Sequence, residues 1–425
     1  MNQVYSTKLN TISTQPKFSP GAICGRYCRY PKSGERLAEG GIRLNGIYKN
    51  SIPNKPLVSI ITVVYNRFAS LERAINSVLR QSYDNIEYII IDGGSTDGTL
   101  SIIKKYQDAI DYYISEPDNG IYNAMNKGLE LATGDYIGIL NSDDWFTEDA
   151  IELSISKILE SGADYSGAWS EYIDDNGNST FTFEPRFFDD TALFSLQPCG
   201  HGTMFVSKNC FETIGKYDEN YQVVADFKMQ MRLISNYLTS CVVNKVTHFF
   251  STSGVSTQRL DITIAELKQL LVECDSRLTI QDAEAIIHLT WNLPFEVKHY
   301  DAIQGLINNL HYSVKQHEYL KEMLGKKCGL VTQERDEVKN ERNQLCLQRD
   351  LLAKEREILA SEADILFKER ELLASQRDIL AHDKENLVIE LQNVYNSKAW
   401  VVTRPLRYSW GLIKSIATHI FRRGH

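Results

Sequence analysis

Polar and mostly acidic residues follow three apolar stretches of the chain, at the point where each stretch ends. These residues are Tyr65 and Asn66, then Asp92, then the pair Asp143 and Asp144. Two adjacent carboxylates can hold a hard divalent cation when a diphosphate supplies the remaining oxygen ligands. Such a cation neutralises the charge that develops on a departing diphosphate. An isolated carboxylate such as Asp92 would instead accept hydrogen bonds from a base or a ribose, or cap a turn.

Parallel β-strands would bring these residues together. The apolar stretches Val58–Val64, Ile86–Ile91 and Asp135–Leu140 are separated by segments of helical length. Strands that are apolar on both faces are typical of a parallel sheet covered by helices. Ligands of such open α/β sheets bind beyond the carboxyl ends of the strands. We therefore expect an α/β fold with a sheet edge that binds a nucleotide and a divalent cation.

The other elements expected before residue 260 alternate in the same way. The loop 92–99 contains glycines, which permit backbone conformations that side chains disfavour, and Ser, Thr and Asp residues that commonly cap helices. The turn Asp174-Asp175-Asn176-Gly177 is typical of a β-hairpin. Strand–helix–strand order implies right-handed crossovers within one twisted sheet. Helices are expected at 68–81, 97–107, 121–132, 149–161 and 228–235, and further strands at 112–115, 168–173, 180–183, 203–206 and 242–246.

Length, charge and cysteine usage limit the classes of protein. A chain of 425 residues exceeds what one core usually needs, so we expect two or more units. The net charge of −9 argues against a nucleic-acid partner. The N-terminus lacks the apolar core of a signal peptide, and no run reaches the ~18 apolar residues of a membrane span. Because the eight cysteines are scattered, we expect reduced thiols in a cytoplasmic protein.

Changes in composition predict further segments around this domain. Residues 1–54 form a polar arm, residues 55–260 the α/β domain and residues 261–330 a helical segment. Residues 331–393 repeat every seven positions, with Leu and Ile in two adjacent phases, which predicts a long supercoiled helix. We expect a homo-oligomer through this coiled coil. Its broad apolar face leaves open a dimer, a trimer or a helix packed on both sides.

The final segment, residues 394–425, combines aromatic and basic residues and contains no Asp or Glu. After Pro405 its apolar residues follow helical spacing. Such a helix fits the headgroup region of an anionic membrane, where each basic residue contributes roughly 1 kcal/mol. The alternative is a solvated amphipathic cap on the coiled coil. We expect the protein to be peripheral, on a membrane surface.

Five motifs, taken in order, resemble the inverting family 2 glycosyltransferases. They are VSIITVVYNR, DGGSTDGT, NGIYNAMNKG, GDYIGILNSDDWF and VVADFKMQMRL, and they cover about residues 55–260, roughly half the chain. The resemblance implies a GT-A fold, with a Rossmann-like mixed sheet covered by helices. It also implies transfer of a sugar from a nucleoside-diphosphate sugar to a saccharide acceptor, with inversion at the anomeric carbon.

The same resemblance implies roles for individual residues. Asp143 and Asp144 would form a variant DXD motif that binds Mg²⁺ or Mn²⁺. Asp144 would be the firmer ligand, and Asn141 stands in place of the first acid. Asp226 would be the general base, and Ala225 stands where a second acid is often found. The residues expected to hold the nucleotide are Tyr65, Asn66, Arg67, Asp92, Gly94 and Asp143.

Three more residues are candidates for contact with the acceptor or a phosphate. Met125 occupies a position where many family members carry an arginine near the phosphates, and Lys127 would compensate for it. His201 precedes an apolar strand on the side expected to face the acceptor, although a lone His in a turn is more often structural. Trp145 follows the metal motif and would either stack on a sugar or pack in the core.

The tail also carries a resemblance. Its segment SKAWVVTRPLR resembles a short segment at the ends of bacterial surface-polysaccharide enzymes. This implies a lipid-linked saccharide acceptor and a role in O-antigen, capsule or exopolysaccharide synthesis. It also implies a place at the cytoplasmic face of the inner membrane.

Three other classes of protein share some of these features with glycosyltransferases. A nicotinamide-dependent Rossmann enzyme is rejected, because the first strand is followed by YNR rather than by GxGxxG. A nucleotidyltransferase stays open, since it also uses a pair of acids at a sheet edge. A degenerate sugar-nucleotide-binding scaffold, organised by its coiled coil, also stays open, because it would explain Asn141, Ala225 and Met125.

Overall fold

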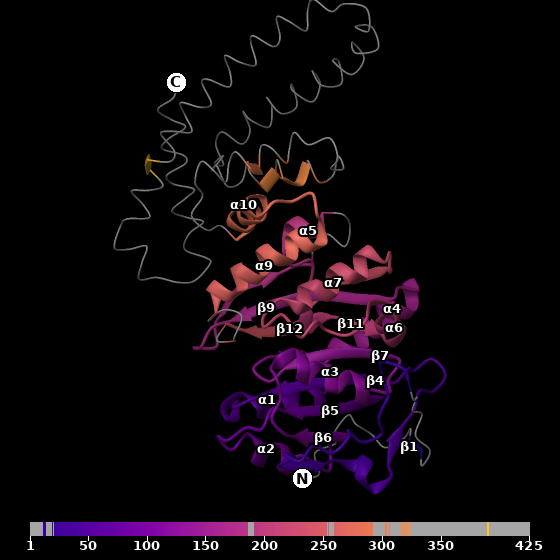
Figure 1. Cartoon of the computed structure of the whole chain (residues 1–425). Coiled ribbons are helices and arrows are strands. Elements are labelled where there is room, and N and C mark those ends of the chain that lie inside the picture. The colour runs from indigo at the N-terminus through magenta and orange to yellow at the C-terminus, as the bar shows by residue number, and fades with distance from the viewer. Residues whose placement is uncertain are drawn as a thin grey trace, which may run out of the picture. The chain divides into compact units, whose positions relative to one another are not determined.

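The computed structural model describes most of the first 291 residues and a few positions beyond them. The chain divides into two compact units, Met1–Leu270 and Leu271–His425 (Figure 1). The expected coiled coil at 331–393 and the expected tail at 394–425 lie outside the described residues, apart from 389–390. The residues described are 12–13, 19, 21–185, 191–252, 254, 259–291, 302–303, 306, 316, 318–320, 322–323 and 389–390.

Four parallel strands form the centre of the sheet in the first unit. β4 (Val58–Val64) pairs with β5 (Ile86–Asp92) on one side and with β7 (Tyr136–Asn141) on the other. β6 (Tyr112–Ser115) pairs with the far side of β5. The predicted parallel strands are thereby confirmed. Because β4 and β5 are paired in register up to their last residues, their carboxyl ends lie at one edge.

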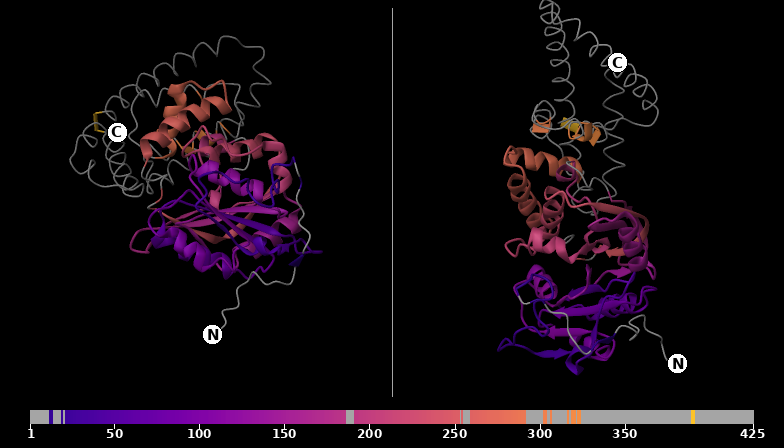
Figure 2. Two further views of the ribbon diagram at one scale, coloured as in Figure 1. Left: turned by 60° about the horizontal axis from the view of Figure 1, so that its bottom comes forward. Right: turned by 90° about the vertical axis from the view of Figure 1, so that its right-hand side faces the viewer.

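Helices cover both faces of this sheet (Figure 2). α1 (Phe68–Leu79), α2 (Thr99–Lys105) and α4 (Ala150–Ser161) share one apolar cluster with alternate residues of β4 and β5. α3 (Ile121–Leu131) packs on the opposite face against the same two strands. Gly128 lets α3 pack closely on β4, because a Cβ at this position would collide with the Ile61 side chain. Both faces of the strands are therefore buried, as their apolar sequences predict.

The second half of the sheet is mixed. β11 (Phe205–Ser207) runs antiparallel between β7 and β9 (Tyr165–Ile173). β12 (Ser240–Ser251) is parallel to β9, and β8 (Trp145–Phe146) is antiparallel to β12. The strand order is β2-β6-β5-β4-β7-β11-β9-β12-β8, and β10 (Ser179–Phe183) pairs with β9. One large mixed sheet flanked by helices therefore joins both halves of the α/β domain.

Three element boundaries differ from the sequence expectation and affect the site. β12 ends at Ser251 rather than at the predicted 246, so it carries His248 and Ser251. α7 (Ala225–Ser235) begins three residues before the predicted position of 228, so Asp226 lies within its first turn. Residues 201–203 form a short 3₁₀ helix, where the sequence predicts the start of a strand at 203. The helix begins early because side chains from distant parts of the chain cap it, and no local pattern signals those contacts.

The N-terminal segment contributes one strand to the large sheet, and its strands β1 (Ile12–Ser13) and β3 (Tyr48–Lys49) pair with each other in a separate two-stranded sheet. β2 (Ala38–Gly40) pairs antiparallel with β6 and forms one edge. The buried Arg43 guanidinium pairs with Glu87 of β5, and the buried Lys49 Nζ lies 2.7 Å from Asp111 Oδ2. Buried charges need such partners. The described part of residues 1–54 therefore packs on the sheet of the first unit.

Two helices follow the sheet. α9 (Leu260–Cys274) begins in the first unit and ends in the second, and α10 (Ile280–Thr290) starts with a capping box between Thr279 and Asp282. Within the described part of the chain, no helix is both long enough and apolar enough to cross a membrane. Cys24, Cys28, Cys199, Cys210 and Cys241 are thiols rather than members of disulfides. The remaining elements are η2 (Ile42–Asn45), α5 (Ala192–Ser195), η3 (His201–Thr203) and α6 (Lys208–Ile214).

Candidate functional site

Asp92 ends β5 and is fully buried in a loop that it helps to order. Its carboxylate accepts hydrogen bonds from Ser95 Oγ at 2.5 Å and from Ser95 N at 3.2 Å. Ser115 Oγ, at the end of β6, donates a third bond at 2.5 Å. The structure thus shows the turn-stabilising role of Asp92. Its contact with a base or a ribose stays a prediction.

The loop after β4 is joined to the same turn. The Asn66 N–H donates to Ser95 Oγ at 2.8 Å, and Asn66 Oδ1 accepts from Thr96 N at 2.8 Å. Gly94 has a φ of 81°, a left-handed conformation that favours glycine. Tyr65 is left 60% exposed beside these bonds. Three of the residues predicted to hold the nucleotide therefore lie together at one edge of the sheet.

Asp144 lies in a buried polar cluster at the end of β7. Its Oδ1 accepts from Ser251 N at 2.9 Å, and Asn141 Nδ2 approaches its Oδ2 at 3.4 Å. His248 Nε2, on β12, lies 3.5 Å from the same Oδ2. The Asp144 and His248 side chains are each 2% exposed. The carboxylate predicted to bind a metal is thus held in place by residues of two strands.

His248 is a candidate that the sequence pattern did not reveal. Its Nδ1 lies 2.8 Å from Ser170 Oγ, where the tautomer decides which atom donates, and its Nε2 faces Asp144. His248 Nε2 and Asn141 Oδ1 are buried, and neither has a hydrogen-bond partner among the described residues. A Cβ on Gly202 would collide with the His248 ring, so glycine is needed there. The signal in the sequence is a single His in an apolar strand, which has no readable spacing to the acid pair.

Asp143, the other acid of the pair, has a strongly perturbed pKa. Burial, together with the charge of Asp144, raises the pKa of Asp143 to about 6. Arg67 acts in the opposite direction, and its Nε lies 3.6 Å from Asp143 Oδ2. Perturbed carboxyl groups of this kind cluster at functional sites. The geometry therefore brings Arg67 and the acid pair together, as predicted.

We expect Asp143→Asn to stabilise the metal-free protein at pH 8. A carboxyl group whose pKa rises from 3.8 to about 6 on folding destabilises the native state above that pH range, since the native state must then hold the charge. A shift of this size predicts a gain of about 1 to 3 kcal/mol in the free energy of unfolding. Urea denaturation in EDTA measures the gain. At pH 4 it should nearly vanish, because native Asp143 is then protonated; a variant less stable than wild type at pH 8 would contradict the assignment.

Trp145 follows the acid pair but is engaged in packing. The Arg73 guanidinium carbon lies 3.5 Å from its ring centroid, and the Phe249 ring stacks on it with centroids 5.1 Å apart. Arg73 Nη2 also donates to Asp143 O at 3.1 Å. Both partners stack on the ring, which fits the packing role; the stacking of Trp145 on a sugar stays a prediction. Arg73, which the sequence pattern did not reveal, holds the backbone of the acid pair.

Asp226, the predicted base, is oriented by its own helix and by α3. Its Oδ1 accepts from Phe227 N at 2.8 Å and lies 3.2 Å from Tyr122 Oη. Tyr122 Oη donates to Val223 O at 2.5 Å. Tyr122 belongs to the NGIYNAMNKG motif, and its contact with Asp226 was not evident from the sequence. The motif therefore links the loop after β6 to the helix that carries the predicted base.

Two buried groups respond to both Asp144 and Asp226. Burial raises the pKa of Tyr172, and the negative charges of Asp144 and Asp226 raise it further. Burial lowers the pKa of His201, and the same two carboxylates oppose that shift. Asp144 and Asp226 therefore both lie within electrostatic range of Tyr172 and His201.

His201 itself has a structural role. Its Nε2 lies 2.8 Å from Tyr217 Oη, and the two rings meet edge to face with centroids 5.6 Å apart. The His201 residue is buried. The predicted contact with an acceptor or a phosphate is therefore not supported, because its Nε2 already has a buried partner. The structural alternative describes His201 better.

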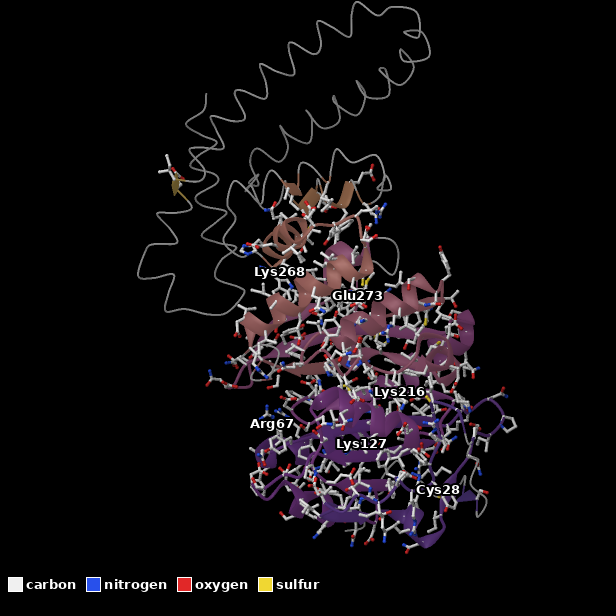
Figure 3. The ribbon with its side chains drawn as sticks, in the orientation of Figure 1. Cys28, Arg67, Lys127, Lys216, Lys268 and Glu273 are labelled. Carbon is white, nitrogen blue, oxygen red and sulfur yellow. The ribbon has the colours of Figure 1, made fainter. Side chains whose placement is uncertain are left out.

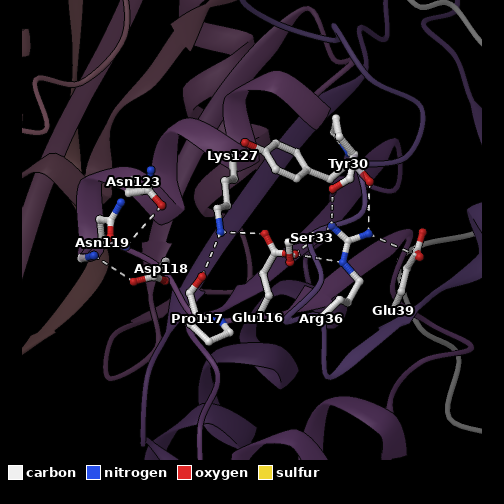
Figure 4. A network of polar contacts seen from close by, with 12 residues as sticks. Tyr30, Ser33, Arg36, Glu39, Glu116, Pro117, Asp118, Asn119, Asn123 and Lys127 are labelled. Carbon is white, nitrogen blue, oxygen red and sulfur yellow. Dashed lines mark hydrogen bonds and ion pairs between the residues drawn. The ribbon is translucent and has the colours of Figure 1, made fainter.

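Lys127 is also engaged elsewhere. Its Nζ lies 2.8 Å from Glu116 Oε1, and Glu116 pairs with Arg36 of the N-terminal segment at 2.9 Å (Figure 4). The Lys127 residue is 7% exposed. Its predicted contact with a phosphate is not supported, because the ammonium group is buried in an ion pair. Figure 3 shows Lys127 within the first unit and Arg67 nearer its edge.

Comparisons of the sequence find relatives among the glycosyltransferases. The profile of Glycosyl transferase family 2 matches residues 59–213. An uncharacterized glycosyltransferase of Mycobacterium tuberculosis is 32% identical over 213 residues, which cover 48% of this chain and 78% of that protein. A PGL/p-HBAD biosynthesis glycosyltransferase of Mycobacterium bovis is 31% identical over 184 residues, which cover 43% of this chain and 71% of that protein.

A comparison with solved structures aligns the chain with the mannosyltransferase PcManGT from Pyrobaculum calidifontis, in complex with GDP-Man and Mn²⁺. It aligns with 66% of this chain and 83% of its own, with a TM-score of 0.43 and 18% sequence identity. The family is established by the sequence relatives, since the Mycobacterium tuberculosis protein is 32% identical over 78% of its length. The chain belongs to glycosyl transferase family 2.

Proposed function

We propose that the protein is a metal-dependent, inverting glycosyltransferase that moves a sugar from a nucleoside-diphosphate sugar to a saccharide acceptor. Membership of the family supports glycosyl transfer. The observation that carries the finer proposal is a series of contacts that links the two carboxylates. His248 lies 3.5 Å from Asp144 and packs against Gly202, the neighbour of His201. His201 Nε2 lies 2.8 Å from Tyr217 Oη, and Tyr217 stacks on Tyr122, whose Oη lies 3.2 Å from Asp226 Oδ1. A cation that neutralises a diphosphate and a base that deprotonates an alcohol must border one reaction space. This arrangement supports both roles.

The residues at the end of β7 fit Mg²⁺ or Mn²⁺. Asp144 and Asp143 offer hard oxygen ligands, and Asn141 Oδ1 and His248 Nε2 are buried polar atoms without a hydrogen-bond partner in the described part of the chain. Among those residues, no group of three or more His, Cys, Asp or Glu side chains forms a complete cage. A cation with few protein ligands suits a site where a diphosphate supplies the others. When bound, it would stabilise the charge of the leaving diphosphate.

The chain's own residues would carry out the transfer. The Asp226 carboxylate accepts the proton of the acceptor hydroxyl while the hydroxyl oxygen attacks the anomeric carbon. The bond from that carbon to the diphosphate oxygen breaks on the opposite face, so the configuration inverts. The transition state would have oxocarbenium character, as in glycoside hydrolysis. Arg67 offers a cation to the nucleoside diphosphate, and Tyr65 offers an exposed ring to its base.

A thermal-shift screen of nucleotide sugars, with and without Mn²⁺, tests this function. The correct donor should raise the melting temperature, because a ligand at 100 times its Kd stabilises the native state by about 2.7 kcal/mol. That donor and a saccharide acceptor should then yield free nucleoside diphosphate. The proposal is wrong if no nucleoside-diphosphate sugar stabilises the protein. Cleavage of nucleoside triphosphates would instead indicate a nucleotidyltransferase.

The acceptor, the assembly and the location are proposed from the sequence. The basic, aromatic segment 394–425 supports a lipid-linked acceptor in surface-polysaccharide synthesis and a peripheral position at the cytoplasmic face of the inner membrane. The heptad pattern at 331–393 supports a homo-oligomer. Co-sedimentation with vesicles that contain anionic lipid tests the first point, and sedimentation equilibrium tests the second. Failure to co-sediment with such vesicles would contradict the membrane position. A monomeric mass at sedimentation equilibrium would contradict the homo-oligomer.

A further inference from the structure

The start of α7 has no capping side chain at its N-cap position. The N-cap residue is Val224, which has no side-chain oxygen to accept bonds from the first backbone N–H groups. Other residues supply the acceptors. Asp226 Oδ1 accepts from Phe227 N at 2.8 Å, and Tyr122 Oη lies 3.4 Å from Asp226 N. The helix turn that carries the proposed base therefore depends on partners outside its local sequence.

Among these partners, Glu266 on α9 accepts the most hydrogen bonds. Its Oε2 accepts from Val224 N at 3.3 Å and from Val223 N at 2.9 Å. Its Oε1 accepts from Gln222 N at 2.6 Å. One carboxylate thus receives three consecutive backbone N–H groups directly before α7. Its negative charge also suits this end of the helix, where the helix dipole favours anions.

The segment 222–224 is held from two helices. Glu266 of α9 binds its N–H groups, and Tyr122 of α3 donates to Val223 O at 2.5 Å. Asp226 follows this segment within a rigid helical turn. The position of the segment therefore sets the position of the Asp226 carboxylate.

We propose that Glu266 is a positioning residue for Asp226, which makes α9 part of the catalytic unit. The inference rests on the proposed function, in which Asp226 is the base. α9 begins at Leu260, beyond residues 59–213 that match the family profile and at the limit of the domain expected from the sequence. The chain thus uses a helix outside the matched region to complete its active site.

Turnover should depend on Glu266, and donor binding should not. A misplacement of about 1 Å at a catalytic group can cost roughly 10²-fold in rate. The loops predicted to hold the nucleotide are ordered by other contacts, which centre on Asp92, Ser95 and Asn66. The hydrogen bonds described for Glu266 all go to residues 222–224. A change at Glu266 should therefore separate kcat from the KM for the donor.

The test compares the full-length wild type with Glu266→Gln and Glu266→Ala. Glutamine keeps one acceptor oxygen and loses the charge, and alanine loses both. We expect kcat to fall about 10-fold in the first and about 100-fold in the second, with a donor KM within about twofold of wild type. Asp261→Asn is the matched control, because Asp261 is an exposed acid in the first turn of the same helix. It should leave both constants unchanged.

Each outcome has a distinct meaning. If kcat of both Glu266 variants equals that of wild type, the inference is overturned and the proposed function is unaffected. If donor affinity falls together with kcat, the inference is also overturned, because Glu266 then supports the fold in general. Donor-induced thermal stabilisation of each variant separates these cases. If the wild type transfers sugar from no nucleoside-diphosphate sugar, the proposed function fails instead.

Discussion

Asp226→Asn should lower turnover by about 10²- to 10⁴-fold and leave the affinity for the nucleotide sugar unchanged. A positioned general base contributes on this scale, and an amide cannot accept the proton. Asparagine has the same size, and its oxygen can still accept from Phe227 N, as Asp226 Oδ1 does at 2.8 Å. Because residue 225 is alanine, the adjacent position offers no acid to replace the lost base. Steady-state rates and calorimetric titration with the donor measure the two effects.

A charge-matched control makes this result interpretable. Asp175 is exposed in the turn between β9 and β10, so Asp175→Asn removes a carboxylate without touching the site. It should turn over at the wild-type rate. Full activity in Asp226→Asn would show that another group is the base. Lost donor affinity in Asp226→Asn would place Asp226 in the donor site instead.

Asp144→Asn should lower turnover by about 10²- to 10³-fold at saturating Mn²⁺ and weaken the dependence of donor binding on the metal. Charge stabilisation by a bound cation is worth several kcal/mol, and every 1.36 kcal/mol is tenfold in rate. Asparagine can still accept from Ser251 N, which donates to Asp144 Oδ1 at 2.9 Å, so the local fold should persist. Donor titrations with Mn²⁺ and with EDTA measure the coupling between metal and donor.

The comparison with the neighbouring acid sharpens this prediction. Asp143→Asn should reduce turnover less, since Asp144 is the predicted firmer ligand and lies within reach of His248 and Asn141. A titration of activity against Mn²⁺ compares the apparent metal affinity and the maximal turnover of the two variants. Equal metal affinity in wild type and Asp144→Asn would remove Asp144 from the metal site. A larger loss in Asp143→Asn would reverse the assignment of the two acids.

The central strands were predictable because burial on both faces leaves a local pattern. Every residue of β4 and β5 is buried, and their predicted ends agree with the structure to within one residue. The beginning of α7 was not predictable in the same way. Its N-cap is a valine, and its acceptors are Tyr122 and Glu266, which come from distant segments. A helix boundary that depends on such partners has no local signal.

The site was predictable in part for the same reason. Parallel strands bring Asp92 and the acid pair to one edge, and the order of apolar runs predicts this edge. The availability of polar side chains was not predictable. Lys127 pairs with Glu116, and His201 pairs with Tyr217, because the fold brings these partners close. A residue type alone does not tell whether its polar atoms are free for a ligand.

The sequence by itself determined the family, the parallel strands and the edge that carries the acids, because apolar runs and motifs are local properties of the chain. Only the tertiary structure decided which side chains surround those acids. It brings His248 of β12 beside Asp144 and Glu266 of α9 to the start of the helix that carries Asp226. Glu266 and Gln222 are 44 residues apart, and Ser251 and Asp144 are 107 residues apart. No periodicity encodes contacts over such separations, so packing between distant elements decides them.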